Sequence, residues 1–441
     1  MAGIRAQASN SLRHPRGVAV TRKKGAESAF KRVLSSLGPG VTTGAADDDP
    51  SGIATYSVAG AQFGNQFAWA ALLTWPLMGC VQMMSARIGM VSGRGLAGAF
   101  RQKFPLWLVA LFGLALLIAN TFNIASDLSA MGDAAEMLGG GPSMIYVVLF
   151  GLGICVAAVR LRYQQLARVL QWLALALFAY VVTAFTVNIG WRDVARATFL
   201  PTLPQGKDAW SMLVAILGTT ISPFLFYWQA GQEIEEQKAQ GLHLVSQRRG
   251  ASKRSIAARR LDIGVGTLFS NLIMFFIIVT TAATLHASGH THIETTRQAA
   301  EALKPLAGSF AYWLFSIGLI GTGLLAIPTL AGSAAYAFAE TFDWNYGLDK
   351  RFRAAAAFYG VFILSMLAAV AIDFIGINPI KALYWSAVLN GVLAPPVLVC
   401  VYLIAADKKI MANQPSPPLV RAVVGVTILV MSAAAIAMFV L

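Results

Sequence analysis

The sequence predicts an all-α polytopic membrane protein, and three observations carry that prediction. Of its 441 residues, 57% are hydrophobic and only 12% are charged, whereas about a quarter of the residues in a soluble domain are charged. The mean hydropathy is +0.63. The apolar residues fall into runs of about 20, the length of a membrane-spanning helix. This pattern excludes a soluble enzyme, a disordered chain and a nucleic-acid-binding domain, despite a formal charge of +14.

Eleven such runs are present, and each is expected to form one span. The first 35 residues are polar and basic and lack an apolar stretch, so no cleavable signal peptide is expected. Cys80, Cys155 and Cys400 lie far apart in apolar runs and predict neither a zinc site nor a disulfide framework. The predicted spans are 39–60, 67–87, 105–128, 143–160, 167–190, 210–231, 263–285, 308–338, 354–373, 381–405 and 419–440.

The distribution of lysine and arginine predicts the orientation of these spans. If the N-terminal tail lies in the cytoplasm, 28 of the 34 basic residues fall in that tail and in the cytoplasmic connections. An excess of basic residues marks cytoplasmic loops. We therefore expect an inner-membrane protein with a cytoplasmic N-terminus and, after eleven spans, an external C-terminus. The expected partners at this point are membrane lipids but no nucleic acid, and the chain is expected to be a monomer without a cofactor.

Two spans contain polar and helix-breaking residues at membrane depth. Residues 44–52 read GAADDDPSG in the first span, and residues 218–224 read GTTISPF in the sixth. Lipid cannot satisfy free backbone groups, so broken helices occur around protein-lined cavities. Interrupted segments at corresponding places in two halves of a transporter indicate inverted repeats and a binding site near the midplane.

The prolines in these breaks provide potential ligands for a cation. Pro50 and Pro223 cannot continue the hydrogen-bond ladder, so each frees carbonyl oxygens upstream. A carboxylate at membrane depth is costly unless it has a functional partner, and Asp49 is therefore read as a cation ligand. Asp47 and Asp48 either line the same cavity or mark a solvated end of the span.

At these residues the chain resembles the Nramp family of divalent-metal transporters. Supporting stretches are the Gly-Pro-Gly at 38–40, GAQFG at 60–64, IGMVSGR at 88–94 and SDL at 126–128. The resemblance implies a LeuT-type fold with two inverted five-helix repeats plus an eleventh transmembrane helix. The implied organisation is a basic tail at 1–36, a first repeat at 37–190, a second repeat at 209–405 and an extra span at 419–441.

In this family the metal sits between the unwound centres of spans 1 and 6. Its ligands come from an Asp-Pro-Gly-Asn motif, a backbone carbonyl and the Met of a Met-Pro-His motif. The matching positions here are Asp49, Gly52 in place of Asn, the carbonyl of Thr219 and Ser222 in place of Met. The two histidine positions of span 6 match Phe224 and Gln229. The span-3 acid matches Ala130, and the span-10 glutamine aligns with Ala387, near Asn390.

These replacements favour magnesium over softer metals. A thioether suits softer transition metals, whereas oxygen ligands suit magnesium, calcium and manganese. Ser51, Gly52 and Ser222 are small, so a wider site that admits a hydrated ion is expected, and magnesium retains several waters. The chain thus resembles the Nramp-related magnesium transporters. It is expected to import Mg²⁺ first and Mn²⁺ second, with weak or no proton coupling because the titrating histidines are absent.

Three other functions compete with this interpretation. The nearest is a proton-coupled Mn²⁺/Fe²⁺ symporter of the ordinary Nramp type. An organic-substrate transporter is disfavoured because Asp49 would repel a substrate carboxylate held at half-helix N-termini. An enzyme is not expected, because the spans contain no histidine and no H-E-x-x-H motif.

Other polar residues have open interpretations. Asn123 and Asp127 share a face of span 3, and Asp127 is a proton relay, an ion-path residue or a structurally satisfied group. Glu233 and Glu236 either form an acidic exit vestibule or mark a solvated helix end. His286, His290, His292 and Glu294 in an outer loop could capture a transition metal or could simply be solvated.

Overall fold

All the regular elements in the described part of the chain are helices. The computed structural model describes residues 39–160, 175–348, 350–376 and 378–440, so the predicted tail at 1–36 lies outside it. Within this part, nine helical segments are long and apolar enough to cross a membrane. The long helices are α2 (Pro39–Asp47), α3 (Pro50–Phe63), α4 (Ala68–Ser92), α6 (Leu106–Gly139), α7 (Ser143–Arg160), α9 (Phe178–Thr186), α11 (Lys207–Thr220), α12 (Pro223–Ala239), α14 (Lys253–Thr284), α17 (Ala311–Phe342), α18 (Ala356–Asp373), α19 (Pro379–Ala405) and α20 (Pro418–Val440).

Spans 1 and 6 are both broken, as predicted. The first break separates α2 from α3 and the second separates α11 from α12. Asp49 and Ser222, the residues directly before the two prolines, are extended, with ψ of 170° and 137°. Proline disfavours the helical region for the residue before it and is well tolerated as the first residue of a new helix. Local sequence therefore accounts for both breaks.

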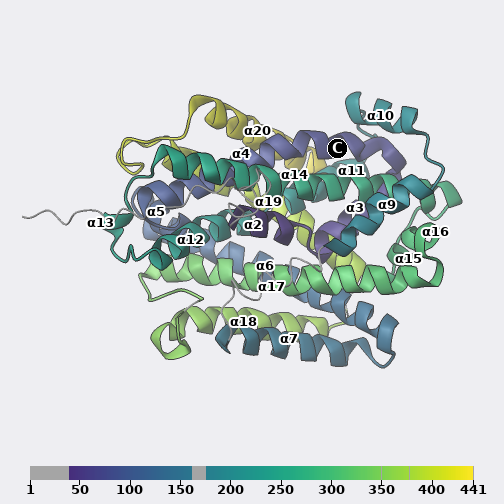
Figure 1. Cartoon of the computed structure of the whole chain (residues 1–441), viewed down its shortest axis with the longest axis horizontal. Helices are drawn as coiled ribbons and strands as arrows, with labels where there is room; N and C mark the ends of the chain where they lie inside the picture. Colours follow the sequence, from purple (N-terminus) through teal and green to yellow (C-terminus); the bar gives the residue numbers. More distant parts are fainter. Residues whose placement is uncertain (1–38, 161–174, 349, 377, 441) are drawn as a thin grey trace, which may run out of the picture. The chain divides into compact units, whose positions relative to one another are not determined.

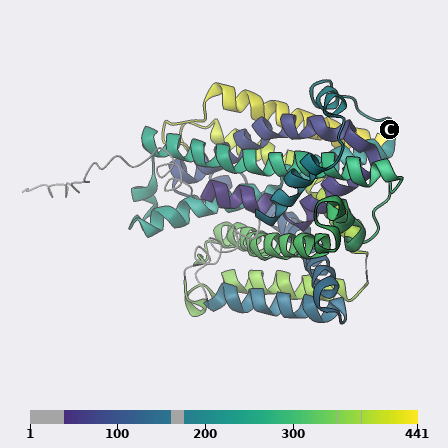
Figure 2. The same cartoon turned by 45° about the vertical axis from the view of Figure 1, so that its right-hand side comes forward.

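The broken helices lie in the interior of the helix bundle. Figure 1 places α2 near the middle, with α20 along one edge and α7 beside α18 along the other. The turned view in Figure 2 keeps α7 and α18 together at that edge. Glycines allow the close approach of the central helices: a Cβ at Gly44 would overlap Gly266 of α14, and one at Gly218 would overlap the Ala387 carbonyl of α19.

Several helices differ in length from the predicted spans. α6 continues to Gly139 instead of ending at 128, and α14 begins at Lys253 instead of 263. The extra turns are more polar, so hydropathy detects the membrane-embedded part but not the helix that projects beyond it. Of predicted span 5, α9 covers Phe178–Thr186, and residues 161–174 lie outside the described chain.

Five short helices lie in the connections that the structure describes, and the sequence does not predict them. They are too short or too polar to give a hydropathy signal. They are α5 (Leu96–Phe100), α10 (Trp191–Phe199), α13 (Val245–Arg248), α15 (Thr296–Ala300) and α16 (Lys304–Ala307).

The basic connections meet at one end of the bundle. Lys103, which precedes α6, forms an ion pair of 2.9 Å with Asp407, which follows α19. Arg248, which precedes α14, donates from Nε to the carbonyl of Gly93 at 3.2 Å. These contacts join the connections that follow spans 2, 6 and 10, so the loops predicted on one side of the membrane do group together. Which side faces the cytoplasm stays a prediction.

Candidate metal site

Asp49 is a buried carboxylate at the first break. Its side chain is 2% exposed and caps the N-terminus of α3. Oδ1 accepts from the Gly52 backbone N–H at 2.8 Å and from the Ser51 hydroxyl at 2.7 Å. The free N–H groups and the positive end of a helix favour a negative charge at this position. The Asp49 side chain is therefore fixed by Ser51 and Gly52, the two residues that follow Pro50.

Two residues from distant helices complete this arrangement. Asn123 of α6 donates from Nδ2 to Oδ2 of Asp49 at 3.1 Å. Ser386 of α19 donates to Oδ1 of Asn123 at 2.7 Å. Asn123 is fully buried, so this chain connects spans 1, 3 and 10 at membrane depth. The sequence identified Asn123 as a candidate site residue but did not identify Ser386.

The second break contributes Ser222 and Thr219. The Ser222 hydroxyl donates to the carbonyl of Gly218 and lies 3.3 Å from the carbonyl of Thr219. A hydroxyl that donates once retains lone pairs on its oxygen. A Cβ at Gly52 would lie 3.3 Å from Oγ1 of Thr219 and 3.2 Å from the Asp47 carbonyl. The two breaks therefore face each other, as the resemblance implied.

The expected widening at Gly52 is not found. Besides those two oxygens, a Cβ at Gly52 would meet the ring of Tyr56 at 3.4 Å. The space that a larger residue would occupy is therefore already filled by neighbouring side chains and backbone. Gly52 allows α3 to pack closely against α11, and the missing side chain does not leave an open volume.

Asp47 and Asp48 are buried rather than solvated. Their exposed fractions are 1% and 0%, so the interpretation that they mark a solvated end of the span is wrong. The Ser270 hydroxyl of α14 lies 2.6 Å from Oδ2 of Asp47 and 3.1 Å from Oδ1 of Asp48. The fold packs α2 against α14, which removes these carboxylates from water.

Asp127 is fully buried on α6. Neither of its carboxylate oxygens has a hydrogen bond of normal geometry. Its electrostatic neighbours are Asp49 and the backbone of Ser51. The structure thus brings Asp127 close to Asp49 and to the Ser51 backbone of α3, so the relay, ion-path and structural interpretations all stay open.

The positions that replace the family histidines serve packing and hydrogen bonding. Phe224 is 1% exposed. Gln229 accepts from the Thr43 hydroxyl at 2.8 Å and donates to Glu233 at 2.8 Å. The contact with Thr43 connects α12 to α2, so Gln229 has a structural role at the α2–α12 contact.

Glu233 and Glu236 belong to an ion-pair cluster around Arg259. Glu233 is 2% exposed and contacts Nε of Arg259 at 2.6 Å. Glu236 contacts the same guanidinium, as does Asp262 at 2.5 Å. The interpretation of Glu233 as part of a solvated helix end is wrong, because α14 covers it. The neutralising Arg259 also reduces the attraction that an acidic vestibule would exert on cations.

The outer-loop histidines do not converge. His286 contacts the carbonyl of Ala61 at 2.8 Å, and His290 contacts the Ser288 hydroxyl at 3.1 Å. Within residues 39–160, 175–348, 350–376 and 378–440, no group of three or more His, Cys, Asp or Glu side chains could hold a metal ion. This loop therefore gives no support to metal capture. The central site, for its part, must rely on one or two carboxylates with hydroxyl, carbonyl and water oxygens.

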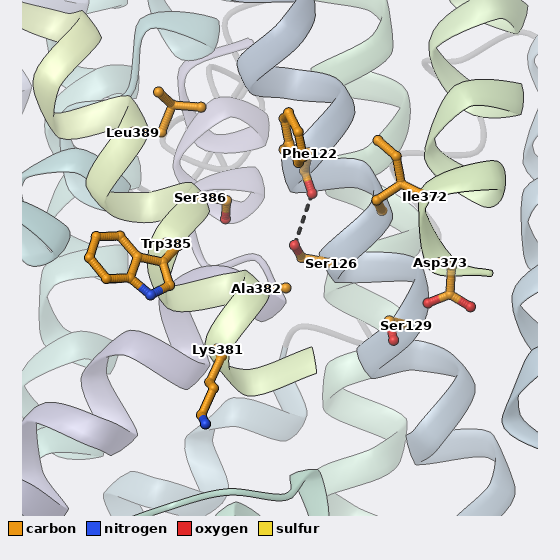
Figure 3. A pocket seen from close by; sticks show the side chains of 11 residues that line it. Phe122, Ser126, Ser129, Ile372, Asp373, Lys381, Ala382, Trp385, Ser386 and Leu389 are labelled. Carbon is orange, nitrogen blue, oxygen red and sulfur yellow. Dashed lines mark hydrogen bonds between the residues drawn. The ribbon is translucent and has the colours of Figure 1, made fainter. Parts of the chain in front are cut away.

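A cavity of about 300 Å³ lies between α6, α18 and α19. Figure 3 shows Lys381 and Trp385 on its α19 side and Asp373 across from them on α18. Most of the lining is apolar, including Phe122 and Leu389, and Asp373 is its single carboxylate, so the cavity offers a hard cation few of the oxygen ligands it needs. Its lining includes Ser386, which also donates to Asn123.

Residues 40–441 match the family described as natural resistance-associated macrophage protein-like, or Nramp. The chain belongs to the Nramp family. Its curated relatives include the divalent metal cation transporter MntH of Caldanaerobacter subterraneus, which is 26% identical over 89% of each chain. The MntH of Klebsiella pneumoniae is also 26% identical, over 87% of this chain and 89% of its own. These relatives are transporters, not enzymes.

Solved structures support the Nramp fold. The Eremococcus coleocola manganese transporter in complex with an aromatic bis-isothiourea compound superposes with a TM-score of 0.73 at 17% identity, covering 95% of this chain and 88% of its own. Mhp1, a nucleobase-cation-symport-1 transporter in a closed conformation, gives 0.56 at 13% identity and covers 91% of both chains. The fold is therefore the LeuT-type arrangement of two inverted five-helix repeats followed by an additional helix.

Sequence reasoning missed three residues near the breaks. Ser270 and Ser386 reach the site from spans 7 and 10, and single serines within apolar spans give no specific signal. Tyr56 lies four residues after Gly52, on the same face of α3, and is fully buried. That spacing could have identified Tyr56 from the sequence.

Proposed function

We propose that this chain is a secondary transporter that imports hydrated divalent metal cations, Mg²⁺ first and Mn²⁺ second. The ion would bind between the α2–α3 and α11–α12 breaks, with Asp49 as the fixed charge. Membership of the Nramp family and the divalent-metal names of its relatives support the general substrate class. The proposal places the protein in the cell membrane with its N-terminus in the cytoplasm.

The observation that carries the magnesium preference is the all-oxygen donor set at the facing breaks. Asp49, the Thr219 carbonyl and the Ser222 hydroxyl contribute oxygen, and the thioether position of the family is Ser222. Magnesium binds oxygen, retains several waters and needs only one or two carboxylates. Few charged side chains converge between the two breaks, which favours an ion that keeps its own water molecules. It disfavours a softer ion that depends on sulfur or nitrogen.

The membrane potential can drive this uptake without protons. A charge of +2 moving through 100 mV gains about 4.6 kcal/mol, twice the value for a single charge. That energy supports a concentration ratio above a thousandfold at about 1.4 kcal/mol per tenfold. Histidine is the side chain whose ordinary pKa lies near neutrality, and Phe224 and Gln229 occupy the family's histidine positions. Weak or absent proton coupling follows from these substitutions.

The test uses purified protein in liposomes that contain a magnesium-sensitive dye, with manganese and calcium dyes in parallel. Wild-type protein should carry Mg²⁺ and Mn²⁺, and Asp49→Ala should reduce uptake of both to the level of protein-free liposomes. Asp133→Asn, which changes an acid hydrogen-bonded to Ser143 and Thr296, is the matched control and should keep wild-type uptake. Uptake by Asp49→Ala at the wild-type rate would contradict the assignment of the site.

A second candidate is the proton-coupled Mn²⁺/Fe²⁺ symporter, which one specific observation favours. Asp127 is buried beside Asp49 without a hydrogen bond of normal geometry, and such a carboxylate can carry a proton. A pH dye inside the same liposomes distinguishes the two candidates. We expect no acidification during Mg²⁺ uptake. Acidification in step with metal entry, abolished by Asp127→Asn, would establish the symporter instead.

A further inference from the structure

Ser51 occupies a position where the family motif has glycine. The first break reads Asp49-Pro50-Ser51-Gly52, whereas the family motif is Asp-Pro-Gly-Asn. The Ser51 side chain is 1% exposed, and its hydroxyl donates to Oδ1 of Asp49 at 2.7 Å. A glycine at this position would have no hydroxyl to donate. Ser51 therefore adds a hydrogen bond to the carboxylate that the proposed function assigns to the ion.

Hydrogen bonds of normal geometry leave one lone-pair site free on the Asp49 carboxylate. Oδ1 accepts from the Ser51 hydroxyl and from the Gly52 backbone N–H at 2.8 Å. Oδ2 accepts from Nδ2 of Asn123 at 3.1 Å, and the Ser51 backbone adds a weaker interaction. A carboxylate has about four lone-pair sites, two on each oxygen. Both sites of Oδ1 are thus filled, and one site of Oδ2 remains.

Asn123 and Ser386 prevent the carboxylate from turning to offer its other oxygen. Oδ1 of Asn123 accepts from the Ser386 hydroxyl at 2.7 Å, so the amide presents its N–H₂ group to Asp49. Both residues are buried. α3 therefore holds Oδ1 and α6 holds Oδ2. Rotation of the carboxylate would break all three hydrogen bonds at once.

A carboxylate held in this way contacts a metal ion through one oxygen. Bidentate binding needs a free site on both oxygens, and Oδ1 has none while Ser51 and Gly52 donate to it. Ca²⁺ takes about six to eight oxygen ligands, often with bidentate carboxylates, whereas Mg²⁺ is octahedral and keeps several waters. The restriction to Oδ2 therefore costs Ca²⁺ more than it costs Mg²⁺.

We propose that Ser51 is a specificity-determining residue that disfavours Ca²⁺ relative to Mg²⁺, because its hydroxyl confines the ion to Oδ2 of Asp49. This assignment rests on the proposed function and adds a residue that discriminates between two hard cations. Softness of the ligand at Ser222 cannot make this distinction, since both ions prefer oxygen. The number of carboxylate oxygens that the ion can reach does make it.

Uptake of Mg²⁺ and Ca²⁺ at equal concentrations, into liposomes that contain the full-length protein and ion-sensitive dyes, tests this proposal. Wild-type protein should favour Mg²⁺. Ser51→Ala frees a site on Oδ1 and should raise the Ca²⁺-to-Mg²⁺ ratio of initial rates by about tenfold, the low end of the change when a group that orients a metal ligand is removed. Ser57→Ala, the same substitution at an equally buried serine of α3, should keep the wild-type ratio.

Asn123→Ala separates the choice of ion from a general loss of order at the site. This variant frees a second site on Oδ2 but leaves Oδ1 filled, so both rates should fall while the ratio changes less than in Ser51→Ala. A shift of the ratio in Asn123→Ala but not in Ser51→Ala would contradict the role of Ser51.

The outcomes also separate this inference from the proposed function. A wild-type ratio in Ser51→Ala, or wild-type protein that carries Ca²⁺ as fast as Mg²⁺, would overturn the role of Ser51 and leave the proposed function intact. No uptake of Mg²⁺ or Mn²⁺ by wild-type protein would overturn both. Size-exclusion profiles and melting temperatures check folding, and Ser51→Gly replaces Ser51→Ala if the latter does not fold. If the folded variant carries neither ion, its affinities for MgCl₂ and CaCl₂ in isothermal titration decide by the same ratio.

Discussion

At the scale of single residues, Asp49 and Ser222 have the same backbone conformation, but the Asp49 side chain accepts hydrogen bonds and the Ser222 side chain donates one. Each is extended and directly precedes a proline that begins a helix. The Asp49 carboxylate points forward and accepts from the amides of α3. The Ser222 hydroxyl points backward and donates to the carbonyl of Gly218 in the last turn of α11. An acceptor suits the N-terminus of a helix and a donor suits the C-terminus, so each residue type fits its own side of a break.

Replacement of Ser222 by the family's residue tests whether ligand softness sets selectivity. Ser222→Met removes the hydroxyl and introduces a thioether, which suits softer metals. We expect Mg²⁺ uptake to fall several-fold and the relative preference for Mn²⁺ and Cd²⁺ to rise, measured as competing initial rates in liposomes. Ser222→Ala is the control that removes the hydroxyl without adding sulfur. An unchanged ion order in Ser222→Met would show that this position does not set selectivity.

At the scale of elements, the Arg259 cluster connects three helices near one end of the breaks. Arg259 of α14 contacts Glu233 of α12 and Asp262 of its own helix. Asp262 also accepts from the backbone N–H of Gly40 at 2.8 Å, near the start of α2. Through Gln229 and Thr43 the same cluster reaches α2 a second time. One buried guanidinium therefore fixes the relative positions of α2, α12 and α14.

Removal of this guanidinium should destabilise the fold. Arg259→Ala removes the cation that the buried carboxylates of Glu233 and Asp262 share, and breaking a buried ion pair costs about 3–5 kcal/mol. We expect a clearly lower melting temperature in detergent, partly restored by adding Glu233→Gln. Arg260→Ala changes the exposed neighbouring arginine and should melt like the wild type. Equal melting temperatures for Arg259→Ala and Arg260→Ala would contradict the structural role of the cluster.

At the scale of the whole molecule, the two ends of the bundle have different character. The contacts of Lys103 with Asp407 and of Arg248 with Gly93 gather the basic connections at one end. The opposite end contains the loop with Ser288 and Glu294, where Asn378 donates to the Glu294 carbonyl at 2.9 Å. The positive-inside rule assigns the basic end to the cytoplasm.

Cysteine accessibility measures this orientation directly. In a background without Cys80, Cys155 and Cys400, Arg254→Cys and Ser288→Cys place single exposed thiols near the two ends of α14. A membrane-impermeant maleimide should label Ser288→Cys in intact cells, and should label Arg254→Cys only after permeabilisation. The reverse labelling pattern would invert the predicted topology.

The sequence by itself determined the class of protein, its apolar spans and the two breaks. These features depend on local properties: a run of about 20 apolar residues forms a helix in lipid, and Pro50 and Pro223 interrupt their helices wherever those helices lie. Asp49 was identifiable because it directly precedes one of these prolines. The departures at Gly52 and Ser222 were likewise visible in the motif.

Only the tertiary structure decided which polar groups meet at the breaks. Ser270 lies 222 positions after Asp48, and Ser386 lies 263 positions after Asn123, yet each forms a hydrogen bond with that partner. The same folding buried Asp47 and Asp48 and paired Glu233 with Arg259. Hydropathy measures how a segment partitions between water and lipid. A buried polar group is instead stabilised by a hydrogen-bond partner, and the packing of the helices decides which partner that is. The partners of these polar groups therefore depend on the packing of distant helices, which no local pattern specifies.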